Sequence, residues 1–316
     1  MFENYHEIGT IFMLHRVSPS EIGRLSANEN MKVSPQFLES FIIQAKSRGY
    51  SFISIDSLYK LFSSNSKSKK NIVITLDDGY LDNYTKAFPI FKKYSVPFTV
   101  YIPTSFPDCT AVIWWYIIED IILQNNEIKL KNGVIYNCET IEKKNLIFLE
   151  LIKLIKSLPA ANFSDKFKDL FKYYKFNSKD YIRKLSLDWD RIKEMANNPL
   201  VTIGAHTVNH PVLKLMTINS INDEILKSKI IIESRIDCKV LHFSYPFGTR
   251  NEVGTREFKI SKIFNFRTIV TARHGNIYLK HKKHTESLPR VMLKNDFSWE
   301  NYEKRSMKKL LKLLVI

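Results

Sequence analysis

Two adjacent carboxylates, Asp77 and Asp78, follow directly after the run Ile72–Leu76, whose mainly β-branched residues predict a short buried strand. The carboxyl end of such a strand is where α/β folds place their active sites. Two neighbouring anions in a partly buried turn repel each other, and a bound cation relieves that repulsion. One carboxylate can then hold the cation while the other acts as a base. Taken alone, this Asp-Asp-Gly sequence is equally consistent with a solvated turn.

A pair of histidines, His206 and His210, also follows a predicted strand, at residues 200–205. Two histidines four residues apart can converge on one face of a helical turn and bind a metal there. Imidazole nitrogens combined with a carboxylate oxygen suit Zn²⁺, which uses three protein ligands in catalytic sites. Because the two strand-end motifs supply complementary ligand types, we predict that they share one metal site.

A third motif, Phe243-Ser-Tyr-Pro-Phe-Gly248, comes after another predicted strand. Proline and glycine fix an irregular turn, and such a turn can direct backbone N–H groups into a cleft. An ordinary strand-to-helix loop is the alternative interpretation of this segment.

Alternating strands and helices must position these motifs. Predicted strands cover residues 50–55, 72–76, 96–102, 200–205, 239–243 and 266–271, and predicted helices cover residues 35–48, 81–94, 218–236 and 251–264. Strand, helix and strand in this order imply right-handed parallel crossovers. Residues 107–188 lie between the two halves and carry long apolar and lysine side chains at helical spacing. We predict that they form a helical insertion rather than a separate domain.

The three motifs, in this order, resemble the first three motifs of the polysaccharide deacetylases, the NodB-homology enzymes of carbohydrate esterase family 4. The resemblance runs to Leu293 and so covers most of the chain. It implies a distorted (β/α) barrel that forms a single catalytic domain over residues 1–316. It also implies metal-dependent removal of N-acetyl groups, or in some members O-acetyl groups, from a surface polysaccharide or its lipid-linked precursor.

Carried over residue by residue, the resemblance assigns Asp77 as the general base. It assigns Asp78, His206 and His210 as ligands of a divalent metal, with Zn²⁺ as the expected ion. The backbone N–H of Phe247 corresponds to the donor that stabilises the oxyanion. No organic cofactor is implied.

Two features depart from the usual family pattern. Ser244 stands where many members have arginine, and the usual C-terminal Leu-x-His is absent. Instead, the chain has Met-Leu-His-Arg-Val near its N-terminus and Leu-Pro-Arg-Val near its C-terminus. This arrangement resembles the circularly permuted branch that acts on poly-N-acetylglucosamine, in which an N-terminal strand supplies the acid histidine and a late arginine supports the base. His15 is therefore the candidate general acid, and Arg290 the candidate partner of Asp77.

Each of these assignments has an alternative. His15 could be a buried histidine that caps a strand, and Arg290 could form a surface salt bridge. Three further histidines in a basic region are rival acids: His274, His281 and His284. Three aromatic residues near the predicted cleft could stack on sugar rings or pack within a helix: Trp114, Trp115 and Tyr116.

Composition narrows the class of protein. Apolar residues make up 44% of the 316 residues and charged residues 25%, which excludes a wholly disordered chain and a polytopic membrane protein. Three scattered cysteines exclude a disulfide framework and disfavour a thiolate zinc site. The net charge of +16 attracts polyanions, but the lysines are spread along the chain and no nucleic-acid module is visible. We expect an acetylated glycan as partner, free or lipid-linked, and no specific nucleic acid.

The two termini bear on location. The N-terminal sequence lacks the features of a signal peptide, so we expect a cytoplasmic protein. Residues 300–316 predict a basic amphipathic helix, because four apolar residues recur at helical spacing: Met307, Leu310, Leu311 and Leu314. Such a helix can contact the inner face of the membrane or dock on the barrel.

Two other function classes remain open at this point. A glycan-binding protein of the same fold could lack the chemistry, although the complete set of Asp77, Asp78, His206 and His210 argues against it. A basic nucleic-acid-binding protein is the weaker alternative, motivated only by the net charge.

Overall fold

Seven parallel strands form a closed barrel in the computed structural model, which describes residues 6–63 and 70–304. Their order around the barrel is β1 (Glu7–Leu14), β13 (Leu288–Met292), β11 (Thr268–His274), β10 (His242–Ser244), β9 (Val201–Ala205), β6 (Phe98–Ile102) and β5 (Asn71–Leu76). The barrel closes because β1 pairs with β13 on one side and with β5 on the other. The sheet extends at its two edges through β4 (Ser51–Phe52) and β12 (Ile277–Tyr278). The predicted distorted (β/α) barrel is confirmed.

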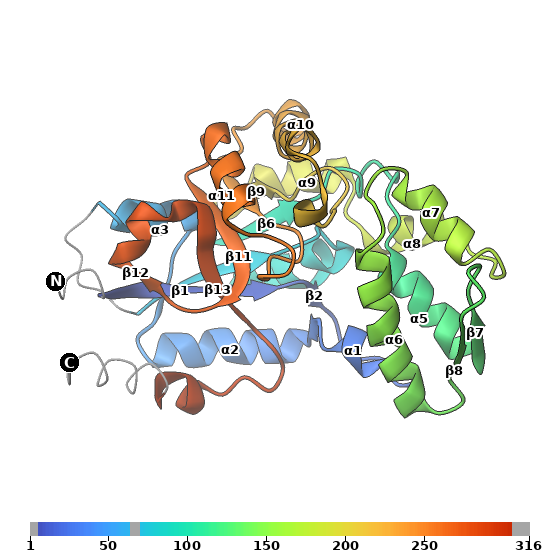
Figure 1. Ribbon diagram of the computed structural model, residues 1–316. Coiled ribbons are helices and arrows are strands. Elements are labelled where there is room, and N and C mark those ends of the chain that lie inside the picture. The colour runs from blue at the N-terminus through green and yellow to red at the C-terminus, as the bar shows by residue number, and fades with distance from the viewer. Residues whose placement is uncertain (1–5, 64–69, 305–316) are drawn as a thin grey trace, which may run out of the picture.

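Helices surround the barrel (Figure 1). They are α2 (Pro35–Ser47), α3 (Ile55–Leu61), α4 (Phe88–Lys93), α9 (Trp189–Ala196), α10 (Ile218–Ile236) and α11 (Thr255–Ser261). The Ser34 hydroxyl accepts a hydrogen bond from the Phe37 N–H and so caps α2, with Pro35 in the first turn. The predicted helix over residues 218–236 is confirmed as α10.

Other predicted boundaries were wrong. The strand predicted over residues 50–55 is only two residues long, because Ser54 caps the start of α3. The helix predicted over residues 81–94 is divided: a π-helical turn, η2 (Asn83–Ala87), precedes α4, which has Pro89 in its first turn. Short 3₁₀ segments follow several elements: η3 (Leu213–Leu215), η4 (Lys262–Phe264), η5 (Leu279–Lys283) and η6 (Thr285–Ser287).

An aromatic cluster holds the C-terminal segment against the barrel. The ring of Trp299 stacks on Phe41 of α2 at 4.9 Å, and Phe41 in turn meets Phe12 of β1 edge to face at 5.1 Å. Residues 299–304 are helical and continue this contact through Tyr302, whose ring lies 5.8 Å from that of Phe12. The remainder of the predicted C-terminal helix, with its four apolar residues, lies outside the described residues.

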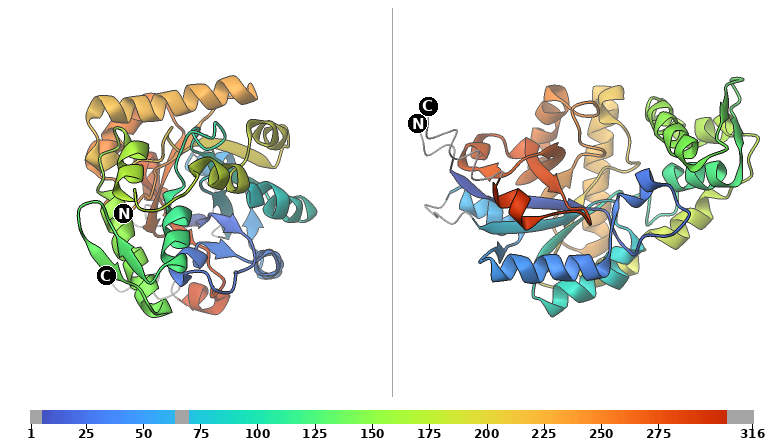
Figure 2. Two further views of the ribbon diagram at one scale, coloured as in Figure 1. Left: turned by 90° about the vertical axis from the view of Figure 1, so that its right-hand side faces the viewer. Right: turned by 90° about the horizontal axis from the view of Figure 1, so that it is seen from below.

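The segment predicted as a helical insertion lies between β6 and α9. It contains α5 (Trp114–Gln124), a hairpin of β7 (Glu127–Lys129) and β8 (Ile135–Asn137), α6 (Ile141–Lys156), α7 (Phe163–Leu170) and α8 (Ser178–Leu185). These elements share an apolar cluster of their own, distinct from the main core around the barrel. They lie together at the end of the barrel toward which the parallel strands run, as the right of Figure 1 and the left view of Figure 2 show.

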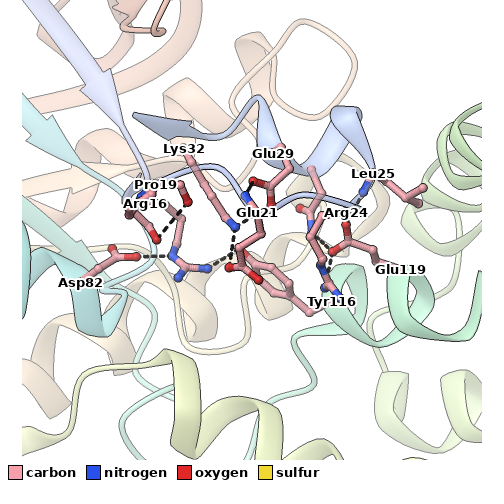
Figure 3. A network of polar contacts seen from close by, with 12 residues as sticks. Arg16, Pro19, Glu21, Arg24, Leu25, Glu29, Lys32, Asp82, Tyr116 and Glu119 are labelled. Atoms are coloured by element: carbon pink, nitrogen blue, oxygen red, sulfur yellow. Dashed lines mark hydrogen bonds and ion pairs between the residues drawn. The ribbon is translucent and has the colours of Figure 1, made fainter. Parts of the chain in front are cut away.

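A network of charged and polar side chains joins the insertion to the N-terminal segment (Figure 3). This segment contains β2 (Arg16–Val17), α1 (Ser26–Glu29) and β3 (Lys32–Val33). The Arg16 guanidinium pairs with Asp82 and donates to the Tyr116 hydroxyl of α5, and Arg24 pairs with Glu119 of the same helix. The segment that follows His15 is thus fixed to the barrel and to the insertion at once.

Within the described ranges, no helix is long and apolar enough to cross a bilayer.

Candidate active site

The sequence motifs all lie at the same rim of the barrel because the strands that carry them are parallel and in register. Leu14 of β1 pairs with Leu76 of β5, so His15 and Asp77 extend from neighbouring strand ends. The Asp77 N–H donates to the Leu14 carbonyl at 3.0 Å and keeps the two strands together beyond the last pair. Phe243 of β10 pairs with Ala205 of β9, which brings the third motif beside the histidine motif.

The Asp-Asp-Gly turn bends sharply after β5. Asp78 has a φ of 72° and Gly79 a φ of 62°, and both values lie in the left-handed region that favours glycine. A Cβ atom on Gly79 would come within 2.6 Å of Cδ1 of Ile102, which would have to shift, and the positive φ would strain any other residue here. At this turn the two neighbouring carboxylates point toward different partners. Strained backbone of this kind persists where the surrounding structure enforces it, and it is often found at functional sites.

The carboxylate of Asp78 faces the two motif histidines. Its Oδ1 lies 3.5 Å from Nε2 of His206 and 3.3 Å from Nε2 of His210, and all three side chains are buried. One ligand atom from each lies within 4.8 Å of the others. The structure therefore brings together the three residues that the resemblance assigned as metal ligands.

Hydrogen bonding shows that this group suits a cation. Nδ1 of His206 lies 2.7 Å from the carbonyl oxygen of Ser244, which can only accept, so that nitrogen carries the proton. In the neutral tautomer with this Nδ1 proton, the lone pair of Nε2 lies on the side of Asp78, whose buried Oδ1 has no hydrogen-bond partner among the described residues. Lone pairs that converge without a proton between them repel each other unless a cation binds. A divalent ion such as Zn²⁺ fits this donor set, and Ser244 orients one ligand from behind.

The loop that carries the histidines is not the helical turn expected from their spacing. Thr207 and His210 have φ values of 67° and 54°, and residues 206–210 adopt an irregular conformation. A buried carboxylate of α10, Glu224, accepts hydrogen bonds from the N–H groups of Val208 and Asn209 at 2.8 and 2.9 Å. The sequence reasoning missed Glu224, although an acidic residue within the apolar stripe of a helix is a signal that could have indicated it.

Glu224→Ala is expected to weaken metal binding by roughly 10- to 100-fold, which is typical when the support of a ligand is removed. The physical reason is that the loop loses three hydrogen bonds, one of them from the Asn209 amide, and His210 loses its fixed position. Competition with a chromophoric zinc chelator measures the affinity. Glu224→Gln, which keeps an acceptor oxygen, should lose less, and Glu150→Ala on an exposed helix face serves as control. Unchanged affinity in Glu224→Ala would show that this carboxylate does not position the ligands.

The second carboxylate, Asp77, is clamped by Arg290. Two guanidinium nitrogens donate to the two oxygens of Asp77 at 2.7 and 2.6 Å. The remaining donors reach the Thr271 carbonyl and the hydroxyls of Thr75 and Ser244. This buried arginine is thus fully satisfied, although it is only 1% exposed. Burial acts to raise the pKa of Asp77, but the Arg290 guanidinium outweighs it and holds that pKa below its usual value. Asp77 is therefore an oriented, ionised acceptor.

His15 lies in the same cavity as both carboxylates and both motif histidines. The Asn83 side chain donates to its backbone carbonyl at 2.9 Å, and its buried Nδ1 has no partner among the described residues. Burial lowers the pKa of His15, and the carboxylates of Asp78 and Asp77 act against that effect. The three rival histidines do not line this cavity: His274, His281 and His284.

The third motif places a backbone donor near the ligands. Phe247 has a φ of 59°, and its ring lies edge to face against His210 at 4.6 Å. The N–H of Gly248 turns back to the Pro246 carbonyl at 2.6 Å. Among the hydrogen bonds between backbone groups of the described residues, none is donated by the N–H of Phe247, which belongs to a residue that lines the cavity.

The cavity above these groups has a volume of about 490 Å³, and the insertion forms one of its walls. Of the three aromatic residues predicted near the cleft, Trp114 and Tyr116 are buried and Tyr116 receives a hydrogen bond from Arg16. Trp115 is half-buried and donates to the Tyr80 hydroxyl at 2.9 Å. All three line the cavity, and Trp115 is the most exposed of them.

Comparison with known proteins supports the family predicted from the motifs. The family model for polysaccharide deacetylase matches residues 64–132 and 159–259, which is more than half of the chain. The chain belongs to the polysaccharide deacetylase family. Members of this family are carbohydrate esterases, so the enzyme class predicted from the motifs, carbohydrate deacetylase, is confirmed by the family.

Solved structures of the deacetylase fold extend along nearly the whole chain. The Streptococcus pyogenes deacetylase PplD in complex with acetate is 20% identical, with a TM-score of 0.64, and the alignment covers 94% of this chain and 98% of PplD. A de-N-acetylase from Aggregatibacter actinomycetemcomitans is 16% identical, with a TM-score of 0.61, and the alignment covers 93% and 98% of the two chains. At these identities the likeness establishes the fold.

A curated relative matches a shorter segment. "Putative polysaccharide deacetylase YxkH" of Bacillus subtilis (strain 168) is 29% identical over 79 residues, which is 25% of this chain and 28% of that protein. The match thus spans just over a quarter of the relative's length.

Proposed function

We propose that this chain is a metal-dependent hydrolase that removes N-acetyl groups from a surface polysaccharide or its lipid-linked precursor, as one catalytic domain. The observation that carries the proposal is that a candidate base and a candidate set of metal ligands lie in one cavity. Asp77 is an ionised carboxylate held by Arg290, and it stands beside Asp78, His206 and His210, whose lone pairs converge. A base beside a metal site can activate a water molecule for attack on the carbonyl carbon of an amide.

Each residue has one task in the proposed reaction. A divalent ion held by Asp78, His206 and His210 would supply a water of lowered pKa and polarise the acetyl carbonyl. Asp77 accepts the proton of the attacking water, and Arg290 keeps both of its oxygens oriented. The N–H of Phe247 donates to the oxygen that becomes negatively charged. The new carbon–oxygen bond replaces the carbon–nitrogen bond, and acetate and the sugar amine are released.

His15 supplies the proton that the departing nitrogen needs. A histidine whose pKa is lowered by burial is a stronger acid, and the neighbouring carboxylates of Asp77 and Asp78 favour its protonated form. Its position at the end of β1, beside the end of β5, gives it access to the cavity that holds those carboxylates.

His15→Ala is expected to lower kcat by roughly 10²- to 10⁴-fold, the usual contribution of a positioned acid, while the bound metal is retained. Steady-state acetate release together with metal analysis measures both quantities. His284→Ala, at a side chain that is 64% exposed, is the matched control and should behave as wild type. A near-normal kcat in His15→Ala, with a loss in His284→Ala, would transfer the role of acid to His284.

The class of acetyl group can be tested directly. N-acetylated glycans, O-acetylated glycans and lipid-linked acetylated sugars are each incubated with the metal-loaded protein, and products are identified by mass spectrometry. We expect a mass loss of one acetyl group from an N-acetylated sugar. Tight glycan binding without any acetyl loss would instead identify a glycan-binding protein. The cytoplasmic location stays a prediction. The contact of the predicted C-terminal helix with a membrane is also a prediction, which vesicle co-sedimentation can test.

A further inference from the structure

The segment that follows the proposed base lies against the proposed acid. The turn after Asp77 leads into the π-helical turn η2, which has Asp82 as its N-cap and begins at Asn83. Helical turns of this kind are rare and are frequently found at functional sites. Asn83 is completely buried and Asp82 is 8% exposed, so both side chains form their hydrogen bonds inside the protein. Their partners lie on the segment of the chain that contains His15.

The two side chains of η2 hold three consecutive residues at the end of β1. The Asn83 amide donates to the His15 carbonyl at 2.9 Å and to Oδ1 of Asp82 at 3.2 Å. Because both acceptors are oxygens, they fix which way this amide faces. Oδ1 of Asp82 also accepts the Val17 N–H at 3.1 Å, and its Oδ2 accepts from the Arg16 guanidinium (Figure 3). The backbone just after the imidazole of His15 is therefore held by one turn.

The imidazole of His15 depends on this support. Nδ1 of the ligand His206 is held by the Ser244 carbonyl, whereas the buried Nδ1 of His15 has no hydrogen-bond partner among the described residues. No contact at Nδ1 fixes the ring of His15, so the place of its backbone determines where the ring lies in the cavity.

One stretch of chain fixes His15 from both sides. The Asp77 N–H donates to the carbonyl of Leu14, the residue before His15, at 3.0 Å. The Asn83 amide then holds the carbonyl of His15 itself. Residues 77–83 therefore set the position of the acid relative to the base before a substrate binds.

We propose that Asn83 and Asp82 are positioning residues for His15, which hold it where its proton reaches the departing nitrogen. This inference rests on the proposed function for the role of His15. When the carbon–nitrogen bond of an N-acetyl group breaks, the nitrogen takes a proton from His15. When para-nitrophenyl acetate is cleaved, para-nitrophenolate leaves as an anion and needs no proton. Loss of a positioning residue should therefore slow the release of an amine and spare the release of para-nitrophenolate.

Turnover of two acetylated substrates by the zinc-loaded protein tests the role of Asn83. For Asn83→Ala, we expect kcat on an N-acetylglucosamine oligomer to fall by roughly 10- to 10²-fold, because a small displacement of a catalytic group has an effect of this size. KM, bound zinc and the turnover of para-nitrophenyl acetate should not change. Asp82→Asn, which keeps the shape of the side chain, should act in the same direction. An equal fall on both substrates, or unchanged turnover of the oligomer in both variants, would overturn the inference.

Asn71→Ala is the matched control. The buried Asn71 amide donates to the Ile8 carbonyl at 2.8 Å and so joins the same two strands, β5 and β1, at their other end. This variant loses a similar hydrogen bond but should keep the ratio of turnover on the two substrates. In the His15→Ala background, Asn83→Ala should cause no further fall in kcat on the oligomer, because Asn83 acts through His15. A further fall in that double variant would contradict the proposal.

NMR of the zinc-loaded protein detects the position of His15 without any turnover. Its Hε1 signal, assigned by its absence from His15→Ala, should shift or broaden in Asn83→Ala and stay unchanged in Asn71→Ala. If wild type releases no acetate but the signal responds in this way, the proposed function fails and the positioning of His15 stands. If wild type releases acetate and the signal does not respond, the positioning fails and the proposed function stands.

Discussion

Asp78→Ala, His206→Ala and His210→Ala are each expected to lose bound metal and deacetylation together. One ligand atom from each of the three side chains lies within 4.8 Å of the other two, so each contributes one donor to the proposed site. Removal of one donor leaves two, which is fewer than the three protein ligands of catalytic zinc sites. Metal analysis of each purified variant after zinc loading gives the stoichiometry, and acetate release gives the activity. His274→Ala, at an exposed histidine outside the site, should retain both.

Asp77→Asn separates the base from the ligands. An amide cannot accept the proton of the attacking water, so turnover should fall by roughly 10²- to 10⁴-fold. The ligand set is intact in this variant, and we expect one equivalent of zinc to remain. Loss of metal in Asp77→Asn, with retention in Asp78→Ala, would reverse the assignment of the two carboxylates.

Arg290→Ala is expected to destabilise the metal-free protein by about 3–5 kcal/mol, the cost of leaving a buried charge without its partner. Asp77 is 3% exposed and would lose its clamp, while the carbonyl of Thr271 and the hydroxyls of Thr75 and Ser244 would lose a donor. Turnover should fall as well, since the Ser244 hydroxyl, which donates to Asp77 Oδ2 at 3.3 Å, would be left to orient this carboxylate without the guanidinium. Urea unfolding monitored by circular dichroism measures the free energy. Arg191→Ala, which breaks an exposed pair with Asp188, should cost no more than about 1 kcal/mol.

A double-mutant cycle distinguishes the ion pair from general loss of packing. Asp77→Ala combined with Arg290→Ala removes both charges, so its cost should be smaller than the sum of the single costs by roughly 0.5–3 kcal/mol. Additivity of the two changes within about 0.5 kcal/mol would show that the pair is not coupled.

The positions of the strand-end motifs could be predicted because local sequence determines them. A run such as Ile72–Leu76 is too apolar and β-branched to remain exposed, and the polar residues that follow it must lie at the strand's carboxyl end. The extent of α10 could be predicted for a related reason, since its apolar residues recur at helical spacing, and in the structure the Thr217 hydroxyl caps its start. In such cases the local sequence determines where the helix or strand begins and ends.

Features that depend on distant contacts could not be derived in the same way. Arg290 meets Asp77 across 213 residues of sequence, and only the resemblance to the permuted branch suggested the pairing. The short side chain of Ser244 leaves room for that arginine, whose Nη2 lies 3.0 Å from the serine hydroxyl. The irregular loop of the two histidines was mistaken for a helical turn because its conformation is fixed by Glu224 of α10, 14 or more residues further along the chain.

Acetate release measured without and with added Zn²⁺ tests most directly the claim that the protein is a metal-dependent deacetylase. The protein is freed of metal with a chelator, dialysed, and assayed on an N-acetylglucosamine oligomer before and after addition of one equivalent of Zn²⁺, with Asp78→Ala treated in parallel. We predict negligible acetate from the metal-free protein, recovery on addition of zinc, and no recovery in Asp78→Ala. Equal acetate release with and without metal, or recovery in Asp78→Ala, would contradict a metal-dependent deacetylase built on Asp78, His206 and His210.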